Sequence, residues 1–218
     1  FDAFFRRATD GHEPHPYQRA LATRTRLPAR LEIPTGLGKT QAVLAAWLWR
    51  RCLADAAVRC GTPRRLVYCL PMRVLVTQTE SVARTMIQRA GLDVRVATLL
   101  GGETAAPEAE PWDICPEAET VLIGTQDMLL SRALNRGYAM SRYRWPIPFG
   151  LLNNDCLWVV DEPQLLGAGL PSTAQLAAFR RRLFAAFGPT GTMWLSATLD
   201  RSWLRTVDVE EADLDDAV

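Results

Sequence analysis

Lysine is almost absent from this chain of 218 residues, because Lys39 is the one lysine among 25 basic residues and the others are arginine. A composition that favours arginine so strongly indicates that Lys39 fills a position where a compact point charge is needed. Histidine is scarce as well. Only His12 and His15 are present and neither is followed by Asp, so a His-Asp metal dyad is excluded.

Cysteine pairs and long apolar runs are also missing. The five cysteines are odd in number and form no C-x-x-C pair, which argues against a disulfide framework and a zinc knuckle. No stretch approaches the roughly 18 consecutive apolar residues of a membrane span, and no signal segment opens the chain. We therefore expect a cytoplasmic protein with no membrane partner. Because the chain opens on Phe1 without a methionine, we expect it to be a fragment.

Acidic residues are concentrated at one end. Residues 207–218 hold six acids and no base, which leaves 25 basic against 18 acidic residues elsewhere. That balance is compatible with a polyanionic partner, although an arginine-rich solvated surface is the more common explanation. With 48% hydrophobic residues, the chain is able to bury a full core. We predict one domain over 1–206 and an acidic linker or truncated boundary over 207–218.

Short apolar runs alternate with longer stretches of helical periodicity, a pattern typical of an α/β fold with a mostly parallel sheet flanked by helices. Ligands of such sheets bind at the carboxyl ends of the strands. The segment 137–155 is predicted to be an irregular insertion, whose aromatic and arginine side chains either stack on nucleic-acid bases or, more commonly, pack over the sheet. The predicted strands are 30–33, 66–70, 94–99, 120–124, 156–161 and 192–196, and the predicted helices are 40–59, 73–90, 126–136 and 172–187.

The most informative motif is PTGLGKT at residues 34–40, directly after the first predicted strand. Its glycines let backbone N–H groups surround an anion, and the following helix adds the positive end of its dipole. Lys39 is expected beside the β- and γ-phosphates of ATP, with the Thr40 hydroxyl on Mg²⁺. Ile33 stands where the strict phosphate-loop pattern has its first glycine. The residues assigned to ATP binding in this loop are Thr35, Gly36, Leu37, Gly38, Lys39 and Thr40.

A second motif ends the fifth predicted strand, where Asp161 and Glu162 follow an apolar run. Acidic pairs commonly end strands in solvent, but this pair lies downstream of a phosphate loop and two further βα units. We therefore interpret it as a Walker B element. Asp161 would hold Mg²⁺ together with Thr40, and Glu162 would orient and deprotonate the water that attacks the γ-phosphate.

These motifs together resemble the first RecA-like domain of superfamily 2 helicases, a P-loop NTPase fold. Residues 70–79, 124–130 and 161–170 are similar to the CRISPR-associated helicase-nuclease of type I systems, and most similar to its subtype G branch. The resemblance covers nearly the whole chain. It implies an ATP-binding motor domain that acts on single-stranded DNA during CRISPR interference, which is an antiviral defence.

The resemblance also implies roles for residues outside the phosphate loop. Gln18 would read the adenine edge with its carboxamide, which offers one donor and one acceptor. Gln164, Ser196 and Thr198 would couple the nucleotide to the nucleic-acid site. Arg73 is expected either to grip a nucleic-acid strand or to pair with a carboxylate. The residues that would contact the strand backbone are Pro71, Arg73, Gly101, Gly102, Thr125 and Gln126.

Three features depart from the family pattern or are missing. Most members carry His where this chain has Gln164, whose amide is still expected to reach Ser196 or Thr198. Pro163 is expected to hold Glu162 in an extended conformation. No nuclease motif is present, so DNA cleavage would belong to another part of a parent protein.

The resemblance implies several partners: a second RecA-like domain with an arginine finger, a nuclease domain and an RNA-guided surveillance complex. Without that second domain, we expect nucleotide binding but little turnover. Two alternatives stay open. The chain is the motor of an RNA helicase or duplex DNA translocase, or it is a nucleotide-gated module that recruits a partner.

Overall fold

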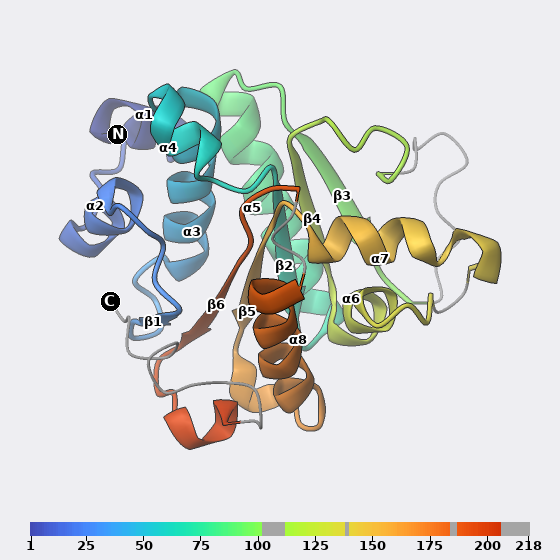
Figure 1. Cartoon of the computed structure of the whole chain (residues 1–218). Coiled ribbons are helices and arrows are strands. Elements are labelled where there is room, and N and C mark those ends of the chain that lie inside the picture. Colours follow the sequence, from blue (N-terminus) through green and yellow to red (C-terminus); the bar gives the residue numbers. More distant parts are fainter. Residues whose placement is uncertain (102–111, 138–139, 184–186, 206–218) are drawn as a thin grey trace.

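The chain forms one parallel β-sheet covered by helices on both faces, as Figure 1 shows. In this computed structural model, which describes residues 1–101, 112–137, 140–183 and 187–205, the strands lie in the order β1-β6-β5-β2-β4-β3. Every neighbouring pair is parallel, which confirms the predicted fold class. The strands are β1 (Arg30–Glu32), β2 (Arg65–Leu70), β3 (Arg95–Leu99), β4 (Thr120–Thr125), β5 (Cys156–Asp161) and β6 (Gly191–Ser196).

Alternate side chains of each central strand enter two separate hydrophobic cores. In β2, Leu66, Tyr68 and Leu70 belong to the core under the first helical layer, whereas Val67 and Cys69 belong to the other. This alternation follows from the period of two in a strand, and both faces are apolar because both are covered. The first layer contains α1 (Asp2–Ala8), α2 (Pro16–Thr23), α3 (Lys39–Leu48) and α5 (Arg73–Ala90), and the second contains α6 (Gln126–Ala133), α7 (Pro146–Asn153) and α8 (Gly169–Leu183).

The predicted helix over 40–59 is interrupted. The α-helical hydrogen-bond pattern of α3 gives way to a π-helical turn, η1 (Trp49–Leu53), and a short helix α4 (Ala56–Cys60) follows. Asp55 begins α4 by accepting a hydrogen bond from the Val58 backbone N–H at 2.9 Å. An aspartate at such a position favours a new helix start over helix continuation. The hydrophobic pattern of the sequence continues through this break, so the pattern does not predict the break.

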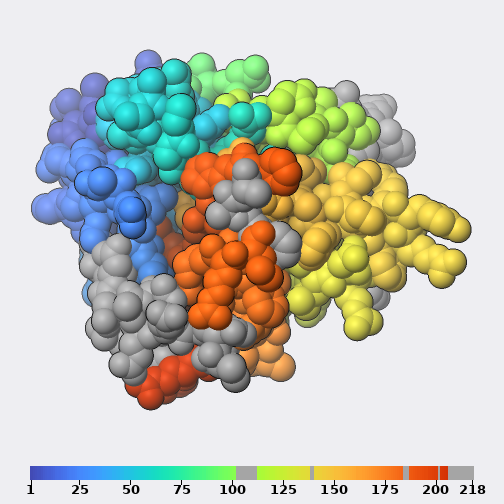
Figure 2. All heavy atoms as spheres, in the orientation of Figure 1, coloured from blue at the N-terminus to red at the C-terminus, as the bar shows by residue number. Residues whose placement is uncertain are grey.

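The segment 137–155, predicted to be irregular, is largely helical. It contains the 3₁₀ turn η2 (Arg142–Arg144) and α7, which begins at Pro146, where proline's missing N–H costs nothing. Leu152 and Asn153 at the end of α7 are fully buried, so this part packs over the sheet as the commoner alternative predicted. Figure 2 shows the other end of this segment, in yellow, projecting from the body of the protein. Tyr143 there is 84% exposed.

Helix α5 has the predicted bounds, 73–90, and the remaining helix ends differ from the prediction by a few residues. Helix α6 stops at Ala133 rather than at residue 136, because Asn135 takes a left-handed conformation. Helix α8 begins at Gly169, before the predicted start. The acidic segment 207–218 lies outside the described residues. No helix in the described part of the chain is long and apolar enough to cross a membrane.

Candidate functional site

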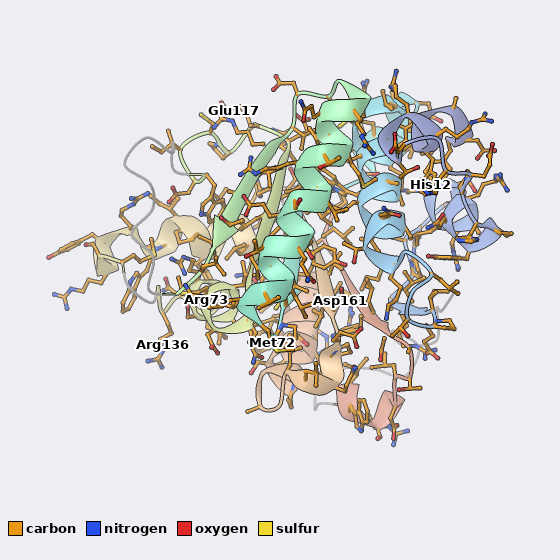
Figure 3. All side chains as sticks on the ribbon, turned by 180° about the vertical axis from the view of Figure 1, so that it is seen from behind. His12, Met72, Arg73, Glu117, Arg136 and Asp161 are labelled. Atoms are coloured by element: carbon orange, nitrogen blue, oxygen red, sulfur yellow. The ribbon has the colours of Figure 1, made fainter. Side chains whose placement is uncertain are left out.

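The carboxyl ends of the parallel strands bring the predicted motifs to one edge of the sheet. Asp161 lies opposite Leu195 in the β5–β6 pair, and Glu32 lies opposite Ser196 in the β1–β6 pair. In Figure 3, Arg73 and Asp161 both lie towards the end of the molecule where α5 begins, whereas Glu117, which precedes β4, lies at the opposite end. Residues distant in sequence therefore share a single edge, as expected for ligand sites in such folds.

The phosphate loop has the backbone that its glycines predict. Gly36 and Gly38 have φ values of 83° and 75°, in the left-handed region that favours glycine. Helix α3 begins at Lys39, so its first N–H groups lie directly beyond the loop. The Tyr17 hydroxyl donates a 2.6 Å hydrogen bond to the Leu37 carbonyl and ties the loop to α2. Thr35, the predicted ATP-binding residue before Gly36, is exposed to solvent.

Gln18 lies under the phosphate loop, with 2% of its surface exposed. Its Oε1 accepts a hydrogen bond from the His15 backbone N–H at 2.9 Å, which helps to start α2. Its Nε2 faces the loop and donates to the Gly38 carbonyl at 3.4 Å. The side chain therefore has a structural part in joining α2 to the loop, beside the predicted contact with adenine.

Lys39 and Glu162 meet across the site. The Lys39 Nζ lies 3.2 Å from Glu162 Oε1, and the two side chains are 10% and 25% exposed. Glu162 Oε2 accepts a second hydrogen bond, at 2.5 Å, from Gln164 Nε2. The predicted phosphate ligand and the predicted base are thus paired with one another, in a partly buried setting where such a pair is less screened than on an open surface.

Gln164 continues the connection from Glu162 to the end of β6. Its Oε1 lies 3.1 Å from Ser196 Oγ, which is the contact expected from the sequence. Ser196 Oγ also accepts from the Thr198 backbone N–H at 3.1 Å and lies 3.0 Å from the Thr198 carbonyl. Because a hydroxyl has one proton, Ser196 donates either to Gln164 or to the Thr198 carbonyl. The Ser196 hydroxyl therefore has two alternative acceptors.

The expected extended conformation of Glu162 is wrong. Glu162 has φ 49° and ψ 54°, in the left-handed region. Two backbone hydrogen bonds account for this turn: the Glu162 N–H donates to the Leu195 carbonyl at 3.0 Å, and the Glu162 carbonyl accepts from the Leu165 N–H at 2.9 Å. A non-glycine residue held in this way costs about 1–3 kcal/mol. Proline restricts the preceding residue away from the right-handed helical region, and the left-handed region also satisfies that restriction.

Tyr68 is a member of the site that the sequence did not reveal. Its hydroxyl donates a 3.0 Å hydrogen bond to Asp161 Oδ2, and the Thr40 side chain also contributes a hydrogen bond to Tyr68. Tyr68 is fully buried in the middle of β2, so in sequence it looks like an ordinary core residue. The one available signal is its polar tip within an otherwise apolar strand. Tyr68 thus touches both side chains predicted to hold Mg²⁺.

Burial dominates the electrostatics around Asp161. Desolvation raises the pKa of the Asp161 carboxyl, and the hydrogen bond from Tyr68 opposes that rise. The pKa of Tyr68 is well above its ordinary value, first because of burial and then because of the neighbouring Asp161 charge. Tyr68 therefore keeps its proton and acts as a hydrogen-bond donor to the carboxylate.

The side chains of Asp161 and Thr40 fit Mg²⁺ by their chemistry. A carboxylate and a hydroxyl are hard oxygen donors, and Mg²⁺ is commonly held by one or two carboxylates together with substrate phosphates. In the described part of the chain, no cluster of three or more His, Cys, Asp or Glu side chains offers an all-protein metal cage. This donor set is the one expected for a metal bound together with a nucleotide.

A cavity of about 930 Å³ lies at the same edge of the sheet, around the start of α5 and α6. The predicted strand-contact residues that fall in the described part of the chain all line it, and Gly102 lies outside that part. Sequence reasoning missed Asp127, Ser131 and the apolar floor formed by Met128 and Leu130. The predicted residues lining the cavity are Pro71, Arg73, Gly101, Thr125 and Gln126.

Solved structures of helicases share this fold. The helicase MrfA, described as a DUF1998 helicase, matches with a TM-score of 0.64 at 20% identity, over 91% of this chain and 29% of MrfA. The RNA helicase Prp28 from Chaetomium thermophilum, bound to ADP, matches with a TM-score of 0.55 at 22% identity, over 92% of this chain and 43% of Prp28. The helicase domain of Pyrococcus furiosus Hef matches with a TM-score of 0.55 at 17% identity, over 93% of this chain and 36% of that solved domain. This chain therefore spans less than half of each.

The sequence itself also matches a family. The model described as DEAD/DEAH box helicase matches residues 17–207, which include the phosphate loop, the acidic pair and the Ser196–Thr198 segment. The matched region begins one residue before Gln18 and covers most of the chain. The protein therefore belongs to the DEAD/DEAH box helicase family, and its sheet is that of a superfamily 2 helicase motor domain.

Proposed function

We propose that this chain is the ATP-binding motor domain of a DNA helicase or translocase that acts on single-stranded DNA in CRISPR interference. The observation that carries the proposal is the paired Lys39 and Glu162, connected through Gln164 to Ser196, at the same sheet edge as the 930 Å³ cavity. The candidate nucleotide site and a cavity for a second ligand thus lie at one edge of the sheet, and the polar contacts that begin at Lys39 end at Ser196 and Thr198, at the end of β6. That arrangement suits a motor in which ATP binding controls the affinity for a nucleic-acid strand.

Each residue of the nucleotide site has a proposed task. Lys39 neutralises charge on the β- and γ-phosphates, and the loop around Gly36 and Gly38 presents N–H groups to them. Asp161 and Thr40 would hold Mg²⁺, which when bound neutralises charge that develops on the phosphates. Glu162 accepts a proton from the attacking water. In the free site Glu162 is held by Lys39, so the arriving phosphates must replace that ion pair.

The polar contacts beyond Glu162 are proposed to report nucleotide state. When ATP draws Lys39 away, Glu162 retains Gln164 as its partner. Any shift of Gln164 changes the acceptor available to Ser196, whose alternative is the Thr198 carbonyl. Ser196 ends β6 and Thr198 follows it, so this exchange would reposition the loop after that strand.

The larger assembly is also part of the proposal. Domain 1–206 would act with a second RecA-like domain that supplies an arginine finger, with residues 207–218 as the linker. The similarity of residues 70–79, 124–130 and 161–170 to the CRISPR-associated helicase-nuclease supports a nuclease domain and an RNA-guided surveillance complex as partners. One solved structure of MrfA is bound to DNA and one of Dbp5 is bound to RNA, so the choice of DNA rests on the similarity to the CRISPR-associated helicase-nuclease.

The choice of polymer is tested by ATPase stimulation in the full-length protein. We expect single-stranded DNA to stimulate hydrolysis more than duplex DNA or RNA, and Arg73→Ala to weaken strand binding by about 1–3 kcal/mol if Arg73 contacts the strand, with a smaller dependence on salt. Arg84→Ala, which removes an exposed ion pair with Glu80 on the same helix, is the matched control. Stronger stimulation by RNA would overturn the DNA assignment, and equal binding by the Arg73 and Arg84 variants would remove Arg73 from the interface.

Tyr68→Phe is expected to lower the affinity for Mg²⁺ during nucleotide binding by about 10- to 100-fold. This is the usual effect of removing a group that orients a metal ligand. The ring stays in the core, so only the hydrogen bonds to Asp161 and Thr40 are lost. Titration with a fluorescent ADP, with Mg²⁺ and with chelator, measures this. Binding in chelator should match the parent chain, and an unchanged Mg²⁺ dependence would show that Tyr68 serves packing alone.

A further inference from the structure

A second cavity, of about 440 Å³, lies at the opposite edge of the sheet from the nucleotide site. It is bordered by the segment before β1, by the start of β6 and by α8. Arg26, Arg50, Arg180 and Arg181 line it, and among the described residues that line it there is no Asp or Glu. The cavity therefore gathers positive charge without a carboxylate in its wall.

Arg180 is the most deeply buried of these arginines, with 1% of its surface exposed. Its guanidinium lies 4.3 Å from the centre of the Trp158 ring. It donates to Asn153 Oδ1 at 3.2 Å and to Thr192 Oγ1 at 3.3 Å. Its Nη2 is buried and has no hydrogen-bond partner within the described residues. All the partners of Arg180 found there are neutral.

Arg50 lies in the π-helical turn η1 and is 3% exposed. Its guanidinium donates to the carbonyls of Ala22, Arg24 and Thr25, where α2 ends. The Arg50 Nε is buried and lacks a partner in the described part of the chain. A π-helical turn often marks a functional position, and here it carries one of the buried charges.

Two buried positive charges thus share one cavity wall, and neither forms an ion pair with a described Asp or Glu. Burial lowers the pKa of Arg180 to about 10, which still leaves the side chain protonated at neutral pH. Buried charges in proteins are normally paired, because desolvation costs several kcal/mol per ion. Helix-end carbonyls and an aromatic face carry partial negative charge and compensate part of that cost, but they do not supply a full counter-charge.

We propose that this cavity binds a small oxyanion ligand, which supplies the counter-charge for Arg50 and Arg180. The planar guanidinium matches the geometry of phosphate and carboxylate groups, so the ligand bears one of these. The exposed Arg26, which also lines the cavity, adds attraction for an anion. The volume leaves room for an organic group beside the anion. This site is independent of the proposed ATP site, since it lies at the other edge of the sheet.

The test is thermal unfolding of the chain in the Lys39→Ala background, which prevents phosphate from acting through the phosphate loop. At constant ionic strength, inorganic phosphate should stabilise this variant saturably, and at ten times its dissociation constant it should lower the unfolding constant about tenfold. Adding Arg180→Met should abolish the effect. Arg182→Met, on the same helix but outside the cavity lining, should retain it. No stabilisation in the Lys39→Ala chain, or equal stabilisation with Arg180→Met, would overturn the proposal.

A second variant covers the case in which Arg180→Met does not fold. Thr190 lines the cavity and is half-buried, so Thr190→Glu places a carboxylate near the arginines. This variant should be more stable than the Lys39→Ala parent without phosphate and should gain nothing from added phosphate. An unchanged response to phosphate would contradict the site. Succinate distinguishes the ligand classes: stabilisation by phosphate alone assigns phosphorylated ligands, and stabilisation by both assigns oxyanions in general.

Discussion

Lys39→Ala is expected to reduce strand-stimulated ATP hydrolysis in the full-length protein by about 10²- to 10³-fold, the usual effect of removing one preorganised electrostatic contact to a transition state. Lys39 is the first residue of α3 and its side chain is only 10% exposed, so the ammonium charge acts in a partly desolvated site. No other lysine exists in the chain to replace it. Phosphate release with saturating single-stranded DNA measures the effect.

Two further variants make that result specific to the phosphate loop. Arg51 forms an ion pair with Glu119 at 3.1 Å and is 13% exposed, so Arg51→Ala removes a comparable charge pair away from the site. It should leave hydrolysis unchanged. Lys39→Arg keeps the charge but brings a broader, planar group, and it should recover only part of the activity. An unchanged rate of strand-stimulated ATP hydrolysis in Lys39→Ala would contradict the proposed function.

The strands could be predicted closely from the sequence because their physics is local. Each is an apolar run of at most six residues bounded by turn residues. Burial on both faces removes the alternating pattern, and the short length then distinguishes a strand from a helix. Strand β5 has the predicted bounds, and each of the other strands differs by one residue at one end. The phosphate loop and the acidic pair were predictable for a similar reason, since their residue types at fixed spacing state the chemistry directly.

The features that could not be predicted from the sequence depend on contacts between residues that are distant in sequence. Tyr68 becomes part of the site only because β2 pairs with β5, which brings its hydroxyl to Asp161. The left-handed Glu162 is imposed by Leu195 on another strand, and no local rule for a residue before proline selects it. Arg180 likewise does not stand out in a sequence with many arginines, and only the structure shows that it is buried with neutral partners among the described residues.

Glu162→Gln is expected to separate nucleotide binding from turnover. Loss of a general base lowers the rate by about 10²- to 10⁴-fold, whereas the phosphate loop and Lys39 remain in place. ATP affinity should be equal to that of the parent chain or higher, because the nucleotide no longer has to displace the ion pair between Lys39 and Glu162. Fluorescent-nucleotide titration and single-turnover hydrolysis in the full-length protein measure the two quantities.

Gln164→Ala is the matched control, since it removes the partner of Glu162 but keeps the base. Unstimulated hydrolysis should persist in this variant and stimulation by the strand should fall, because the connection from Glu162 through Gln164 to Ser196 is lost. The same Glu162→Gln chain separates a motor from a recruitment module. A motor that binds ATP but cannot hydrolyse it stays on its strand without moving, whereas a nucleotide-gated module still recruits its partner fully. Complete ATP-dependent recruitment by Glu162→Gln, with no loss of strand displacement, would therefore contradict the motor.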